Sequence, residues 1–326
     1  QAACPAHATG KVLDPKAFIM GIRDMAEAAE VTMNVIPNSP IVAQAYGLGG
    51  DAPAAAAMAT PIVGNAIPYE AVWDCVTCGA CVEACPVLIE HVDKMVGLRR
   101  NLVLEESRFP QELNGAFRNM EGVGNPWGQP RAGRTDWTKG LPFRIPTMAE
   151  LAAEGRLADL EVLYWVGCAA AFDDRNRRVA RAFVTCLDAA GVRYAVLGQE
   201  ESCTGDPARR MGNEYLWRML AEANIATLGG YAGVTIVTAC PHCFSALGTD
   251  YAQLGFRVEV VHHSTFLARL VADGRLRSAA SADQGTITYH DACYLARYNG
   301  VIADPRSILE AVRPGALREM DRHGRD

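Results

Sequence analysis

The spacing of apolar residues changes near residue 158 and divides the chain into two regions. Before this point apolar residues recur at helical spacing, over residues 18–29 and again over residues 87–102. The first of these helices has a clear start, because Asp14 suits the N-cap and Pro15 the first helical position. The pattern predicts an α-helical domain over residues 1–105. Within it, residues 37–70 are rich in Pro, Ala and Gly, which favours an irregular segment with at most a short helix.

After residue 158, short apolar runs rich in β-branched and aromatic residues alternate with helical patterns. The predicted strands are 161–166, 192–197, 234–238, 257–261 and 286–289. Gly191 and Gly274 follow two of the intervening helices, at positions typical of a helix end. This alternation predicts an α/β domain with a mostly parallel sheet over residues 158–326. Residues 106–157 contain several prolines and are expected to connect the two domains.

The chain contains eleven cysteines, and four of them form a recognisable motif. Cys75, Cys78, Cys81 and Cys85 have the spacing C-x2-C-x2-C-x3-C-P of bacterial ferredoxins. Three thiolates two residues apart can hold one cuboidal cluster from a single loop, whereas structural zinc usually takes two separated CxxC pairs. The motif therefore predicts an iron–sulfur cluster.

In domains with two such motifs, the fourth cysteine ligates the other cluster. Cys4-Pro5 repeats the Cys-Pro that ends the motif. We therefore expect Cys4 to join Cys75, Cys78 and Cys81 on one cluster. Cys85 would serve a second cluster, whose other ligands would precede residue 1, so that the chain would be truncated at its N-terminus.

A second set of cysteines falls where the predicted strands end. Cys168 follows strand 161–166, Cys203 follows strand 192–197, and Cys240 and Cys243 follow strand 234–238. Because the carboxyl ends of parallel strands meet at one edge of a sheet, these four thiols predict a metal site. Cys186, in contrast, lies within a helical pattern and is predicted to be a core residue.

A weak internal repeat extends this second set. The segment LYWVGC at 163–168 resembles TYHDAC at 288–293, which places Cys293 where Cys168 lies in the first copy. The partners expected for Cys293 would follow Asp326, so that the chain would also be truncated at its C-terminus.

Charge and hydropathy exclude several functions. The formal net charge of −6, with Lys and Arg scattered along the chain, predicts no nucleic-acid partner. No run of 18 apolar residues is present, so no membrane span is predicted in this chain. No glycine-rich dinucleotide motif follows a strand, so we expect any flavin or nicotinamide to reside on a partner.

Polar residues near the cysteines have simpler interpretations. His262 and His263 could line the site, but Ser264 or Thr265 is the more natural cap of the helix that follows. His242, which lies in the CPHC loop, is expected to form a hydrogen bond next to the site rather than to ligate a metal. Arg99 and Arg100 are expected to complement a helix dipole. Arg209 and Arg210 either begin a solvated helix or raise the potential of a nearby cluster.

The spacing of Cys168, Cys203 and the 240–243 CxxC pair resembles the CCG-type cysteine-rich domains of heterodisulfide reductase and glycolate oxidase iron–sulfur subunits. Longer segments are similar to the iron–sulfur oxidoreductases associated with acyl-CoA dehydrogenase and electron-transfer flavoprotein. They include CVTCGACVEACPVLIEHVDKMVGLRR, NPWG at 125–128, SCTGDPARRMGNEYLW, TACPHCFSALGTDY and YHDACYLARYNG. This family resembles a membrane-bound electron-transfer flavoprotein:menaquinone oxidoreductase.

The resemblance implies two [4Fe-4S] cubanes in a ferredoxin-like domain, followed by cysteine-rich α/β repeats. Cys168, Cys203, Cys240, Cys243 and Cys293 map onto those repeats and imply a further iron–sulfur cluster or zinc. Thr204 stands where the CCG pattern has a second cysteine, which argues against a five-thiolate noncubane cluster in the first repeat. A four-thiolate cubane or zinc fits that repeat at least as well.

The resemblance also implies a route for electrons, from reduced electron-transfer flavoprotein or a flavin dehydrogenase to menaquinone. The menaquinone would be reached through a membrane domain outside this chain, at the cytoplasmic side of a bacterial cell membrane. Two alternatives stay open: thiol–disulfide chemistry like that of heterodisulfide reductase, or a non-catalytic electron-transfer subunit of a flavin dehydrogenase such as glycolate oxidase. The sequence identifies no catalytic residue.

Overall fold

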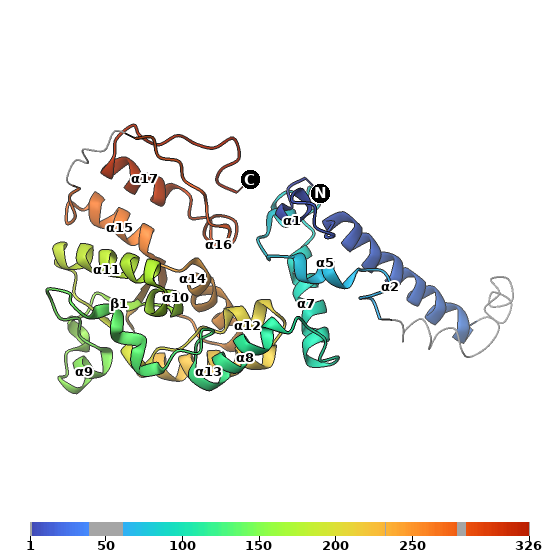
Figure 1. Cartoon of the computed structure of the whole chain (residues 1–326), viewed down its shortest axis with the longest axis horizontal. Helices are drawn as coiled ribbons and strands as arrows, with labels where there is room; N and C mark the ends of the chain where they lie inside the picture. The colour runs from blue at the N-terminus through green and yellow to red at the C-terminus, as the bar shows by residue number, and fades with distance from the viewer. Residues whose placement is uncertain (1, 39–60, 232, 279–284, 326) are drawn as a thin grey trace. The chain divides into compact units, whose positions relative to one another are not determined.

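The computed structural model describes residues 2–38, 61–231, 233–278 and 285–325. The chain forms two compact units, one ending at Arg99 and one running from Arg100 to Arg325 (Figure 1). Each is described by itself. Among the described residues, none of the helices is both long and apolar enough to cross a bilayer.

The first unit is helical. Its elements are α1 (Pro5–Ala8), α2 (Pro15–Asn38), α5 (Tyr69–Asp74), α6 (Ala80–Glu83) and the larger part of α7 (His91–Leu104). The predicted start of α2 is confirmed, because Asp14 Oδ1 accepts the N–H groups of Lys16 at 2.8 Å and Ala17 at 3.2 Å. Most of the segment predicted to be irregular, 37–70, lies outside the described residues.

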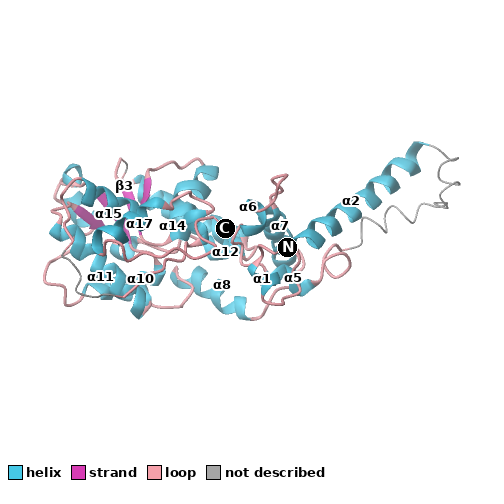
Figure 2. Ribbon diagram, turned by 90° about the horizontal axis from the view of Figure 1, so that it is seen from above, coloured by secondary structure: helices cyan, strands magenta, loops and turns pink. Residues whose placement is uncertain are grey.

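The second unit is built on a parallel sheet of four strands (Figure 2). These are β1 (Val162–Trp165), β2 (Tyr194–Val196), β3 (Thr235–Thr238) and β4 (Val260–His262), in the order β2-β1-β3-β4. The parallel sheet predicted from the alternating pattern is confirmed. Gly191 and Gly274, which follow α11 (Asp174–Ala189) and α15 (His263–Ala272), have the positive φ of helix ends.

The fifth predicted strand, 286–289, is wrong. Within the described residues, Ile287 forms only an isolated bridge with Leu317. A β-branched run becomes a strand only where a second extended segment pairs along its length, and here the pairing stops after one residue.

Residues 106–157, expected to be a connector, contain helices that belong to the second unit. They are α8 (Glu112–Val123), η1 (Arg131–Thr138), α9 (Met148–Ala153) and η2 (Leu157–Asp159). Trp137 and Met148 from this segment are buried, and Trp137 meets Tyr164 of β1 edge to face at 6.1 Å. The prolines therefore mark turns between short helices of the second unit.

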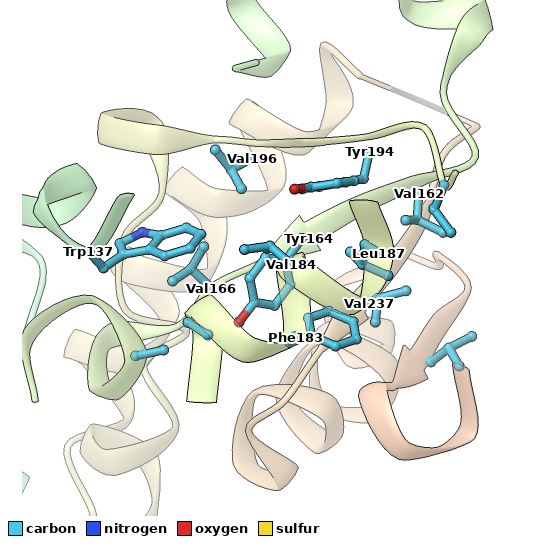
Figure 3. Packing of buried hydrophobic residues seen from close by; sticks show 14 of the residues in the cluster. Trp137, Val162, Tyr164, Val166, Phe183, Val184, Leu187, Tyr194, Val196 and Val237 are labelled. Carbon is cyan, nitrogen blue, oxygen red and sulfur yellow. The ribbon is translucent and has the colours of Figure 1, made fainter. Parts of the chain in front are cut away.

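One face of the sheet packs against α11. Alternate residues of β1, such as Val162 and Tyr164, meet Phe183, Val184 and Leu187 of α11 in one buried cluster (Figure 3). Each fully buried apolar side chain of this kind contributes about 1.5–3 kcal/mol relative to exposure.

The remaining elements of the second unit are α10 (Cys168–Phe172), η3 (Gly198–Glu200), α12 (Asp206–Arg210), α13 (Glu214–Gly229), α14 (Pro241–Ser245), η4 (Ala246–Asp250), η5 (Tyr251–Leu254), α16 (Cys293–Ala296) and α17 (Ala303–Val312).

Candidate metal centres

Four cysteines gather at the carboxyl edge of the sheet because of its strand order. β1 lies between β2 and β3, so the segments that follow these three strands are neighbours. Cys168 begins α10 after β1, Cys203 follows β2, and Cys240 and Cys243 stand at the start of α14 after β3. A Cβ on Gly167 would lie 3.5 Å from Cys243 Sγ, which shows how closely the segments after β1 and β3 approach. We call these four residues the sheet-edge thiols.

The sheet-edge thiols form two hydrogen-bonded pairs. The hydrogen bond with Cys203 lowers the pKa of Cys168, and the positive charge of Arg134 reinforces this against the effect of burial. The hydrogen bond with Cys243 likewise lowers the pKa of Cys240 to about 6. In each pair the pKa of one thiol is therefore lowered, and the thiolate is the form that ligates metals.

A buried ion pair lies against Cys168. Arg134 Nη1 donates to Glu201 Oε1 at 2.9 Å, and Arg134 Nη2 donates to Cys168 Sγ at 3.2 Å. Glu201 accepts the N–H groups of Val166 and Gly167 at 2.9 and 2.8 Å. The sequence offers no signal for this pair, because Arg134 belongs to the expected connector and Glu201 looks like a surface carboxylate.

The loop that carries Cys203 is held from several sides. Asn224 donates to the Cys203 carbonyl at 2.9 Å, and the Tyr251 hydroxyl donates to the Thr204 carbonyl at 3.0 Å. Gly205 N–H points at Cys203 Sγ at 3.4 Å. Thr204, the residue at which the loop departs from the CCG pattern, is buried. These contacts fix the position of the Cys203 sulfur.

The CPHC loop is tied into a charged network. His242 Nδ1 lies 2.8 Å from Asp206 Oδ2, and its ring lies against Tyr294 of α16 with a centroid distance of 3.9 Å. This agrees with the expected hydrogen-bonding role of His242. Arg210 pairs with Asp206 and Asp250 at 3.0 Å each.

Arg209 belongs to the same network, since it pairs with Asp250 at 2.9 Å and its guanidinium lies 4.1 Å from the Trp217 ring centroid. The two arginines that the sequence offered as cations near a cluster therefore have their charges paired with carboxylates.

The helix cap predicted at Ser264 or Thr265 is wrong, because His262 is the N-cap of α15. Its Nδ1 accepts from Ser264 N–H at 3.4 Å and lies 2.7 Å from Ser264 Oγ. Burial lowers the pKa of His262 to about 3 and that of His263 to about 4, so both imidazoles are neutral. An imidazole can cap a helix as a hydroxyl does when its ring nitrogen is held in the acceptor form.

Cys293 begins α16, as Cys168 begins α10, so the two copies of the repeat share this local feature. The preceding segment does not join the sheet. Asp291 forms a two-point ion pair with Arg306, with distances of 2.8 and 2.7 Å, and accepts Gly324 N–H at 2.7 Å. Asp291 therefore anchors the C-terminal segment.

In the first unit, Cys4, Cys75, Cys78 and Cys81 line one cavity with apolar neighbours such as Leu13 and Phe18. The structure thus brings together the four cysteines that the motif spacing assigns to one cluster. Burial, followed by the nearby Cys75, Cys78 and Cys4 sulfurs, raises the pKa of Cys81 to about 11. Thiolates crowded in such a place favour a positively charged group among them.

The loop itself is shaped towards these sulfurs. Thr77 adopts a positive φ of 52°, and its N–H points at Cys75 Sγ at 3.4 Å. Arg99 is fully buried on α7 and donates to the Val72 carbonyl at 3.0 and 2.8 Å and to the Cys75 carbonyl. The expectation that Arg99 complements a helix end is therefore wrong, because α7 continues to Leu104 and the guanidinium holds the cluster loop.

Cys85 does not line that cavity but a second one, which shares Cys4 and Cys81 with the first. This second cavity has a volume of about 270 Å³ and is also lined by Pro86 and Ile89. Ile89 N–H points at Cys85 Sγ at 3.4 Å. The role of Cys85 as a ligand of a different cluster stays a prediction.

The residues present fit iron–sulfur clusters by the chemistry of their donors: thiols, backbone N–H groups aimed at sulfur, and a guanidinium on one thiol. Burial, followed by the charge of Glu201 and the sulfurs of Cys243 and Cys240, raises the pKa of the Tyr164 hydroxyl, which has no hydrogen-bond partner in the described part of the chain. Across the described residues, no group of three or more His, Cys, Asp or Glu side chains is arranged to bind a single metal ion.

Comparison with known proteins gives one domain match and several relatives. Residues 162–248 match the model of the family described as "Cysteine-rich domain" (CCG). A probable iron–sulfur-binding oxidoreductase, FadF, of Bacillus subtilis is 39% identical over 98% of this chain and 47% of its own length. The EtfAB:quinone oxidoreductase of Syntrophomonas wolfei is 39% identical over 94% of this chain and 43% of its own length.

A more distant relative is one subunit of the dihydromethanophenazine:CoB–CoM heterodisulfide reductase of Methanosarcina mazei, which is 30% identical over 77% of this chain and 59% of its own length. The chain spans about half the length of the first curated relatives it matches. No solved structure matches.

Proposed function

The chain belongs to the family of iron–sulfur oxidoreductases with a cysteine-rich CCG domain, and from this we propose that it relays electrons from reduced electron-transfer flavoprotein towards menaquinone. The observation that carries the proposal is the similarity to the EtfAB:quinone oxidoreductase, which extends over 94% of this chain.

In this proposal the first unit is a ferredoxin-like domain. Cys4, Cys75, Cys78 and Cys81 would hold one [4Fe-4S] cubane, and Cys85 would ligate a second. The apolar lining of the first cavity would keep water from the cluster, and Arg99 would hold the loop that carries Cys75 in place. A bound cluster supplies reversible one-electron transfer.

The sheet-edge thiols would hold a further cluster, for which a four-thiolate cubane is our choice over zinc. The relative FadF is named as iron–sulfur-binding, and the lowered pKa of Cys168 and Cys240 suits ligation by thiolates. Cys293 would serve a second cysteine-rich repeat, together with residues of the complete protein. The menaquinone site and its membrane domain would also lie elsewhere in the complete protein, at the cytoplasmic side of the membrane.

The similarity to a heterodisulfide reductase subunit raises thiol–disulfide chemistry as a second function. Thr204 argues against it for the first repeat, because a buried threonine stands where a second thiol would be needed. An electron relay makes no such demand on this position.

The test uses the full-length protein loaded with its clusters. Reduced electron-transfer flavoprotein is supplied as electron donor, and reduction of a water-soluble menaquinone analogue is followed by absorbance. We expect Cys243→Ser to abolish this reduction and Cys186→Ser to leave it unchanged. Cys186 is a matched control, because it is a half-buried cysteine of α11 outside both cysteine sets.

A cluster-loaded protein that does not accept electrons from the flavoprotein would overturn the proposal. Reduction of a heterodisulfide by the same preparation, without quinone reduction, would favour the second function instead.

A further inference from the structure

The ion pair of Arg134 and Glu201 is almost completely buried. The side chains are 3% and 1% exposed, and they come from η1 and from the loop after η3. Removing two charges from water is costly, and a buried pair is often no more stabilising than apolar residues of the same volume. Its position next to a candidate ligand therefore calls for another explanation.

The two ends of the Arg134 guanidinium have different partners. Nη1 binds Glu201 at 2.9 Å, whereas Nη2 binds Cys168 Sγ at 3.2 Å and lies 3.5 Å from the Gly124 carbonyl oxygen. Glu201 also accepts two backbone N–H groups, that of Gly167 on the same Oε1 and that of Val166 on Oε2. The positive charge is thus in contact with the sulfur, and the negative charge stands behind it.

We propose that Arg134 sets the electron affinity of the cluster held by the sheet-edge thiols, and that Glu201 positions Arg134 and partly offsets its charge. The inference rests on the proposed function, since it needs a cluster at this site. Hydrogen bonds and charges near the sulfurs are known to set cluster potentials.

The physical reason is the electrostatic attraction between the Arg134 guanidinium and the negative charge of the cluster. When the cluster accepts one electron from its donor, its negative charge grows by one, no ligand bond breaks and no proton is taken up. Arg134 stays protonated throughout, because a guanidinium does not lose its proton in proteins. The fixed positive charge of Arg134 beside Cys168 therefore favours the reduced cluster and raises the midpoint potential of the cluster.

This assignment predicts shifts of opposite sign. Arg134→Gln removes the positive charge next to the sulfur, so the midpoint potential should fall. Glu201→Gln removes the opposing negative charge, so the potential should rise. The double variant should fall between the two single variants. A merely structural pair would not give shifts of opposite sign.

The experiment is an EPR-monitored redox titration of the full-length protein, with iron and sulfide content measured on each sample. We expect the equilibrium affinity of the cluster for an electron to fall at least tenfold in Arg134→Gln, which is about 59 mV for a one-electron couple. Arg134→Lys keeps the positive charge but loses the two-pronged guanidinium geometry, so it should shift the potential less. Arg218→Gln is the control, because it breaks an exposed Arg–Glu pair on α13.

Two results would overturn the inference while leaving the electron relay intact. The first is an unchanged potential in Arg134→Lys together with an unchanged potential in each Gln variant that retains its iron. The second is a shift of the same sign in Arg134→Gln and Glu201→Gln. A wild-type protein without iron or sulfide at this site would overturn the cluster assignment, and the inference with it.

Discussion

Replacing Gly205 with alanine tests how tightly the Cys203 loop is packed. Gly205 has a φ of +80°, in the left-handed region. A Cβ at this position would lie 2.9 Å from Trp217 Cδ1 and 3.1 Å from the Cα and the carbonyl oxygen of the same residue. Two of these three atoms are backbone atoms of α13, so they cannot move aside as a flexible side chain would.

Two costs add at Gly205. The left-handed conformation costs a non-glycine residue about 1–2 kcal/mol, and overpacking a filled site costs about 1–3 kcal/mol more. We therefore expect Gly205→Ala to reduce the free energy of unfolding by about 2–5 kcal/mol. Gly255 is a matched control, because its φ is +81° but a Cβ added there would meet no atom within 4 Å. Gly255→Ala should show only the first cost.

The assay is thermal unfolding of the two variants and the wild type, with the iron content of each sample measured alongside. For a unit of this size, 1 kcal/mol shifts the midpoint by roughly 2–4 °C. Gly205→Ala should therefore unfold at a clearly lower temperature than Gly255→Ala. It should also lose iron from the sheet-edge thiols, since the displaced loop carries Cys203. Equal midpoints and equal iron content in the two variants would refute the reasoning.

Three further predictions concern the first unit and the pH response of the second. Cys81→Ser should remove the cluster expected in the cavity shared with Cys4, Cys75 and Cys78, whereas Cys85→Ser should leave it in place; iron content and EPR measure this, and loss of the same signal in both variants would contradict the assignment. Arg99→Met should leave the buried Val72 carbonyl and the partly buried Cys75 carbonyl without their donor, at a cost of about 1–3 kcal/mol, and should speed iron release to a chelator. Arg23→Met, at an exposed position, is the control, and equal rates would count against the role of Arg99. The hydrogen bond from Arg275 lowers the pKa of Glu161 below its ordinary value of 4.5, although burial opposes this. The ionised Glu161 therefore stabilises the fold above pH 4.5, and this stabilisation is lost as the pH falls through the lower pKa of the folded state. The stability difference between wild type and Glu161→Gln, at most about 1 kcal/mol, should therefore vanish in acid; a difference that stays constant from pH 7 to the acid limit of folding would show that it has another origin.

The features that the sequence by itself determined are local ones. The spacing of Cys75, Cys78 and Cys81 places three thiols on one loop whatever surrounds it. Asp14 caps α2, and Gly191 and Gly274 end helices, because capping depends on a few consecutive residues. The alternation of strands and helices also predicts the parallel sheet, since its strands need helical crossovers.

The tertiary structure decided everything that depends on which segments become neighbours. The order β2-β1-β3-β4 brings Cys168 close to Cys203 and Cys243, although these residues are far apart in the sequence. The same long-range packing places Arg134 on Cys168 and Arg99 under the Cys75 loop, and it denies residues 286–289 a partner strand within the described chain. Periodicity carries no information about such contacts, because the free energy of burying a charge or pairing a strand depends on the partner that folding supplies.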